Sequence, residues 1–74
     1  MSTEIVLRNP PALTGRETDV LKSLLAGETA KLTASRLGIS PKTVETYRAR
    51  LKAKLNVQNT VELVRVALQS GLVV

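Results

Sequence analysis

The stretch ASRLGISPKTV, from Ala34 to Val44, constrains the fold of this chain more than any other. Two helices that cross steeply need a small residue where they touch, a turn residue that tolerates positive φ, and a branched apolar residue that returns to the core. Ala34, Gly38 and Val44 meet these needs at spacings of four and then six residues. The stretch therefore predicts two helices joined by a tight turn.

Helix start and stop signals support this pair. Gly38 ends a short helix near residues 29–37, and Ser40 followed by Pro41 is an N-cap with proline at the first helical position. The helix that starts there should run over about 41–55. This arrangement is the spacing of a helix-turn-helix, in which the second helix is the recognition helix.

Two further helices flank the pair. Thr14 with Glu17, and Asn59 with Glu62, each have the three-residue spacing of a capping box. The first box opens a helix before the pair, and the second opens a helix over about 60–70. Without any strand signal, the sequence predicts an all-α, four-helix bundle.

A chain of 74 residues holds a single domain with a small core. That core must be aliphatic, because the sequence has no Trp, no Phe and one Tyr. Residues 1–12 end in a proline pair that forbids helix, so they are interpreted as an N-terminal arm or linker. Residues 13–74 are predicted to form the domain.

Positive charge gathers in one part of the chain. The net charge is +5, with 11 Lys and Arg against 6 Asp and Glu, and seven of the cations but only one acid lie in residues 31–54. Such a concentration favours nucleic acid or another acidic surface as the partner. The alternative is that the charge serves only solubility.

Several classes of function are disfavoured by what the sequence lacks. There is no Cys and no His, which removes thiolate chemistry, the commonest general base and the commonest nitrogen ligand for metals. We therefore expect no enzyme activity, no catalytic residue, no cofactor and no metal. No apolar run is long enough to cross a membrane, so a cytoplasmic protein without a membrane partner is expected.

The stretches LTGRETDVLKSLLAG, ISPKTVETYRARLKAKLNV and NTVELVRVALQSGLV resemble the LuxR/FixJ/GerE-type DNA-binding domain, over Leu13 to about Val73. The resemblance implies a transcription regulator that binds double-stranded DNA, with the third helix in the major groove and the fourth in dimer contacts. Such domains usually follow a receiver or sensor domain, so the chain is expected to be either the effector domain of a response regulator or a free-standing regulator. RNA polymerase is a further candidate partner. The second helix departs from the family, because this chain has KLTA where the family commonly has KEIA. Leu32 therefore stands where an acid is usual, and Thr33 where Ile is usual.

Side chains on the outer face of the recognition helix are the candidates for DNA contact. Base contacts are expected from the N-terminal half of this helix, as in helix-turn-helix docking generally. The candidates are Glu45, Thr46, Ala49 and Arg50. Glu45 has an alternative role in stabilising the helix N-terminus.

Phosphate contacts are expected from cations and hydroxyls beside that face. The candidates are Lys31, Lys42, Thr43, Tyr47, Lys52 and Lys54. Tyr47 is as well explained by packing at the margin of the core. The lysines have the alternative of being ordinary exposed residues.

The fourth helix is apolar on two sides, which a domain this small cannot bury alone. The first stripe, interpreted as core, comprises Val61, Val64, Leu68 and Leu72. The opposite stripe, predicted as the homodimer interface, comprises Leu63, Val66, Ala67 and Ser70. Two copies would then place two recognition helices on a two-fold symmetric DNA site.

Two alternatives remain open at this point. Glu17 either pairs with Arg48 in a partly buried ion pair or serves only as the acid of its capping box. The whole chain is either a DNA-binding domain or a protein interaction module that uses its basic face and its apolar fourth helix. A membrane-surface helix is disfavoured, because the basic helix has no Trp or Phe to insert.

Overall fold

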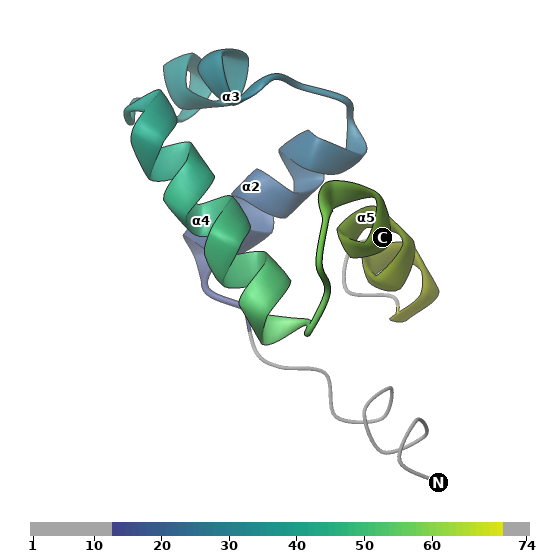
Figure 1. Cartoon of the computed structure of the whole chain (residues 1–74). Coiled ribbons are helices and arrows are strands. Elements are labelled where there is room, and N and C mark those ends of the chain that lie inside the picture. Colours follow the sequence, from purple (N-terminus) through teal and green to yellow (C-terminus); the bar gives the residue numbers. More distant parts are fainter. Residues whose placement is uncertain (1–12, 71–74) are drawn as a thin grey trace, which may run out of the picture.

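The computed structural model describes residues 13–70, so the predicted arm over residues 1–12 lies outside the described part. The described residues form four helices in the order α2 (Gly15–Leu25), α3 (Ala30–Leu37), α4 (Pro41–Lys54) and α5 (Thr60–Ser70), with no strand among them (Figure 1). The predicted all-α helix-turn-helix bundle is confirmed. Within this range, no helix is long and apolar enough to cross a membrane.

Helix α2 begins with the capping box that the sequence predicts. Thr14 is the N-cap, and its hydroxyl accepts a hydrogen bond from the Glu17 amide at 3.1 Å. In return, Oε1 of Glu17 accepts a hydrogen bond from the Thr14 amide at 3.0 Å. Two amides that the first turn leaves without helical partners are thereby satisfied.

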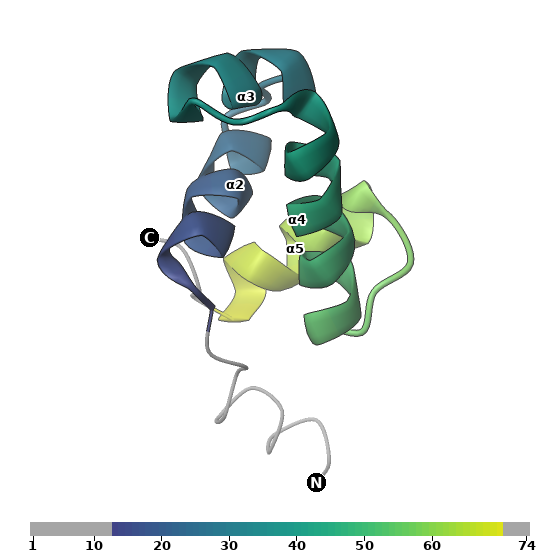
Figure 2. The same cartoon turned by 90° about the vertical axis from the view of Figure 1, so that its left-hand side faces the viewer.

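The turn between α3 and α4 has the geometry that its residues require. Gly38 has φ 71°, in the left-handed region where glycine carries no steric penalty. The amide of Ile39 donates to the carbonyl of Ala34 at 3.0 Å, and Ser40 caps α4 through the Thr43 amide at 3.1 Å. α3 therefore lies across one end of α2 and α4 and meets α4 at a steep angle (Figures 1 and 2).

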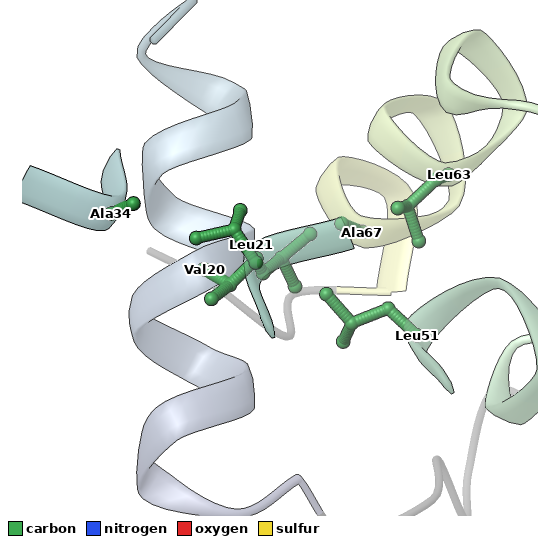
Figure 3. Packing of buried hydrophobic residues seen from close by; sticks show 7 residues of the cluster. Val20, Leu21, Ala34, Leu51, Leu63 and Ala67 are labelled. Carbon is green, nitrogen blue, oxygen red and sulfur yellow. The ribbon is translucent and has the colours of Figure 1, made fainter. Parts of the chain in front are cut away.

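The core is small and wholly aliphatic, as predicted, and residues from all four helices contribute to it (Figure 3). Its buried members are Val20, Leu21, Ala34, Val44, Leu51, Leu63 and Ala67. Tyr47 is half-buried and packs against the edge of this cluster. Burial of the apolar sides of α2, α4 and α5 against one another fixes which side of α4 remains outside.

The assignment of the two sides of α5 from sequence is wrong. Leu63 and Ala67, predicted at a dimer interface, have no exposed surface and belong to the core. Val61 and Leu68, predicted in the core, are 69% and 61% exposed. The helix docks against α2 and α4 through its Leu63 stripe.

The remaining members of the two stripes are intermediate. Val64 and Val66 are half-buried, and so is Ser70, whose hydroxyl donates to the Val66 carbonyl at 2.7 Å. Leu72 lies outside the described residues. The exposed apolar surface of α5 is therefore centred on Val61 and Leu68.

Candidate nucleic-acid interface

One side of α4 faces outward with a sequence of short and charged side chains. Beneath them, Val44 and Leu51 are fully buried and attach the helix to the core. The exposed residues on this side are Lys42, Glu45, Thr46, Ala49, Arg50 and Ala53, and Pro41 and Lys54 are exposed at the two ends of the helix. All four candidates for base contact thus lie together on the exposed face of one helix.

The side chains along the middle of this face are short. Ala49 and Ala53 end at Cβ, and the hydroxyl of Thr46 folds back to donate to the Lys42 carbonyl at 3.1 Å. The long exposed side chains of this face belong to Lys42, Glu45 and Arg50. A helix of this shape can approach a flat or concave surface closely along its length.

Arg48 lies on the inner margin of α4, where its side chain is 16% exposed. Its Nη2 donates to the backbone carbonyl of Glu28 at 3.2 Å, and its Nη1 lies 3.9 Å from the carboxylate of Glu45. Its Nε is buried without a hydrogen-bond partner. The guanidinium therefore links α4 to the segment before α3. Neither alternative for Glu17 holds, because it does not pair with Arg48 and it does more than serve as the acid of its capping box.

Glu17 instead pairs with Lys54, whose Nζ lies 2.6 Å from its Oε1. The hydrogen bond from Lys54 lowers the pKa of Glu17 below its ordinary value of 4.5, and the bond from the Thr14 amide acts in the same direction against the effect of burial. The carboxylate is therefore charged at neutral pH. A phosphate contact by Lys54, predicted from sequence, would have to compete with this ion pair.

The other phosphate candidates are distributed around the outer face. Lys31 on α3 and Lys42 on α4 are exposed, and Lys52 is half-exposed. The hydroxyl of Thr43 lies 2.9 Å from that of Ser40 at the start of α4. These groups belong to α3 and α4, and Lys42 lies one turn before Thr46 on the exposed face.

Tyr47 and Arg50 form a pair on the same helix. The guanidinium carbon of Arg50 lies 5.6 Å from the centroid of the Tyr47 ring. This distance is within the range of a cation–π interaction. The ring therefore takes part in both the core margin and the exposed face.

A polar network around Glu28 was not predicted from the sequence. Its Oε1 accepts hydrogen bonds from the Thr33 hydroxyl and from Nη2 of Arg36, each at 3.1 Å. The same Arg36 nitrogen donates to the Ser23 hydroxyl at 2.5 Å. The bond from Arg36 lowers the pKa of Glu28, against the effect of desolvation.

This network gives a reason for the unusual Thr33. The side chain is fully buried, and Glu28 supplies the acceptor that a buried hydroxyl needs. A polar residue on the apolar side of the second helix was the available signal in the sequence. The network joins α2, the loop after it and α3, and so supports the turn that precedes α4.

Comparison with known proteins identifies the family of this chain. The family model described as "Bacterial regulatory proteins, luxR family" matches residues 11–67. The chain is 41% identical over 61 residues to the transcriptional regulatory protein FixJ of Bradyrhizobium diazoefficiens, which covers 82% of this chain and 30% of the relative. It is 51% identical over 53 residues to the transcriptional regulatory protein UhpA of Escherichia coli, which covers 72% of this chain and 27% of the relative.

A third relative, the transcriptional regulatory protein MctR of Rhizobium johnstonii, is 46% identical over 61 residues, covering 82% of this chain and 28% of the relative. The chain thus spans less than a third of the length of these three relatives. The comparison with solved structures gave no significant match.

Proposed function

The chain belongs to the luxR family of bacterial regulatory proteins, and on that basis we propose that it binds a specific DNA sequence with α4 in the major groove. Binding to DNA in the regulation of transcription is the function that the names of its relatives support. The family is not enzymatic. The observation that carries the finer proposal is the exposed strip of short side chains on α4 with cations beside it.

Base readout is assigned to the side chains on that strip. Glu45 can accept a hydrogen bond from a cytosine amino group, and Arg50 can donate two bonds to guanine. Thr46 and Ala49 are short enough to contact a thymine methyl group while the helix axis stays close to the groove. The exposure of all four residues supports this assignment.

Phosphate contact is assigned to the groups that surround the strip. Lys31 and Lys42 are exposed, Lys52 is half-exposed, and the Thr43 hydroxyl lies at the N-terminus of α4. Contacts of this kind fix the register of a protein on the duplex and supply affinity that is independent of sequence. A DNA partner also explains why the only acid on the outer face of α4 is Glu45.

We further propose that two copies bind together through α5. The exposed Val61 and Leu68 lie seven residues apart, two turns along one side of the helix, and are the apolar surface that a partner would cover. A two-fold dimer would hold two recognition helices about 34 Å apart, one turn of DNA, and so select a two-fold symmetric site.

The relatives are more than three times as long as the matched segment, which fits a chain that acts as the DNA-binding part of a larger regulator. A receiver or sensor domain would then supply the signal, and RNA polymerase is a candidate partner at the promoter. Because bacterial DNA lies in the cytoplasm, this function would be exercised there.

Selection of bound sequences from random double-stranded DNA tests the proposal directly. We expect a two-fold symmetric consensus to be enriched, and the enriched duplex to bind more tightly than random DNA at moderate salt. Absence of binding at low ionic strength would contradict the proposal and favour the protein interaction module. Binding without any enriched sequence would contradict base readout by α4 alone.

A further inference from the structure

The stacked pair on α4 joins a residue anchored in the core to a residue exposed on the binding face. Tyr47 and Arg50 are three residues apart, which places them on the same side of the helix. The Tyr47 ring packs against the core cluster and is half-buried, whereas Arg50 is exposed. The guanidinium carbon lies 5.6 Å from the ring centroid.

Among the described residues, the Tyr47 ring is the group that restrains the Arg50 side chain. Within residues 13–70, the structure gives Arg50 no hydrogen bond and no ion pair with another side chain. The acid on the same face, Glu45, lies against Arg48 instead, at 3.9 Å. An arginine held by one aromatic face keeps all its donors available.

We propose that Tyr47 is a positioning residue whose ring holds the guanidinium of Arg50 in the orientation that α4 presents to DNA. This inference rests on the proposed function and deepens it. It gives Tyr47 a role that uses the ring, in place of the phosphate contact through the hydroxyl that the sequence predicts. Arg50 remains the residue that touches DNA.

The physical basis is preorganisation. A long arginine side chain loses conformational freedom when it binds, and a contact that already restricts it in the free protein reduces that loss. The planar guanidinium lies well on an aromatic face, and a single tyrosine ring fixed by the core offers such a face on one side. Phenylalanine offers the same face, whereas leucine offers none.

A double-mutant cycle on DNA binding tests the proposal. Dissociation constants for the selected duplex are measured by fluorescence anisotropy for the wild type, Tyr47→Leu, Arg50→Ala and the double variant. Tyr47→Leu should weaken binding about two- to fivefold. In the Arg50→Ala background, the same substitution should cause no further loss, because there is no guanidinium to position.

Two controls separate the effect of the ring from that of the hydroxyl and from a general weakening of α4. Tyr47→Phe should bind as tightly as the wild type, and a loss equal to that of Tyr47→Leu would show that the hydroxyl contacts phosphate. Lys42 is an exposed cation on the same helix, so Lys42→Ala combined with Tyr47→Leu should give additive losses. Additive losses for Tyr47 and Arg50 would overturn the proposal.

Folding is checked by thermal melts, with binding measured well below each midpoint. If Tyr47→Leu does not fold, Tyr47→Met fills the gap with a flexible side chain that has no aromatic face. NMR of the DNA-free protein gives an independent readout: ring-current shifts of the Arg50 δ protons should persist in Tyr47→Phe and vanish without the ring. Absence of these shifts in the wild type would contradict only this inference, whereas a wild type that binds no DNA would contradict the proposed function.

Discussion

One carboxylate oxygen serves both the cap of α2 and the ion pair with α4. Oε1 of Glu17 accepts from the Thr14 amide at 3.0 Å and from Nζ of Lys54 at 2.6 Å. The Glu17 side chain is 4% exposed. The start of the first helix and the end of the recognition helix are therefore joined through a single buried atom.

The stability of the domain should depend on pH through the carboxyl groups of Glu17 and Glu28. Glu17 and Glu28 both have a pKa below the ordinary 4.5, so their charged forms favour the folded state. That contribution is complete above about pH 5 and is lost as the pH falls below 4.5 and through the lower pKa of each folded carboxyl. We expect the urea concentration at the unfolding midpoint to decrease as the pH is lowered from 5 to 3 and below.

The variant Glu17→Gln isolates the contribution of the Glu17 carboxylate to the stability. The variant should be less stable than the wild type at pH 7, and it should lose less stability on acidification. Asp19→Asn changes an acid on α2 whose side chain is 49% exposed, and serves as the matched control with little expected effect. An equal acid-induced loss in Glu17→Gln and wild type would contradict the ion pair as a source of stability.

The turn before α4 should depend on the backbone of Gly38. A Cβ there would meet nothing within 4 Å, so Gly38→Ala should act through its φ of 71° alone and cost about 1 to 2 kcal/mol of unfolding free energy. Gly15→Ala is the matched control, because a Cβ at Gly15 also meets nothing and its φ is not in the left-handed region. Chemical denaturation should show that control as neutral or stabilised by up to about 1 kcal/mol.

Salt dependence should be shallower than the number of cations indicates. Three of the seven cations in residues 31–54 contact the protein itself, namely Arg36, Arg48 and Lys54. Arg50 is assigned to base readout, which leaves Lys31, Lys42 and Lys52 for phosphate. With these three on phosphate, the logarithm of the binding constant should fall against the logarithm of salt concentration with a slope of about −2.7 per domain, whereas seven would give about −6.3. Anisotropy titrations across a salt series on the selected duplex measure this slope, and a value near −6 would contradict the assignment.

Dimeric binding should depend on the exposed side of α5. Leu68→Glu places a charge where the proposed seam is apolar, so occupancy of a two-fold site should fall at least about tenfold while a single half-site is bound as before. Gln69→Glu adds the same charge at the neighbouring exposed position and should have a much smaller effect. Electrophoretic mobility shifts on paired and single sites distinguish these outcomes, and full occupancy by Leu68→Glu would contradict the seam.

Leu63 provides the contrast on the same helix. Because it is fully buried, Leu63→Ala should lower the unfolding free energy of the monomer by about 2 to 5 kcal/mol. Leu68→Ala, at a position 61% exposed, should change it by less than about 0.5 kcal/mol. A stable Leu63→Ala monomer would restore the face assignment made from sequence.

Features that depend on residues close together in the sequence were predicted better than features that depend on distant residues. The capping box at Thr14 and the turn at Gly38 involve residues within a few positions of one another, and these features were confirmed. At the start of α5 only half of the predicted box forms, because Asn59 accepts from the Glu62 amide while the Glu62 carboxylate accepts from the amide of Gln58. On α5, both sides carry apolar residues, so periodicity located the stripes around Leu63 and Leu68 without saying which one α2 and α4 would cover. That choice depends on tertiary packing.

Long-range polar contacts could not be predicted from the sequence for the same reason. Glu17 and Lys54 are 37 positions apart, and Arg48 was an equally basic alternative on the same helix. The candidate base contacts were placed on the exposed face of α4 because burial of Val44 and Leu51 determines the opposite side. Their contacts with DNA stay predictions.

The composition of the core has a practical consequence. With no Trp and no Phe, Tyr47 is the chain's sole aromatic residue, and it borders the exposed face of the recognition helix. The intrinsic ultraviolet emission of the unmodified protein therefore comes from one known position. Quenching of that signal can monitor events at α4 without a label, and no second aromatic residue of the chain contributes to it.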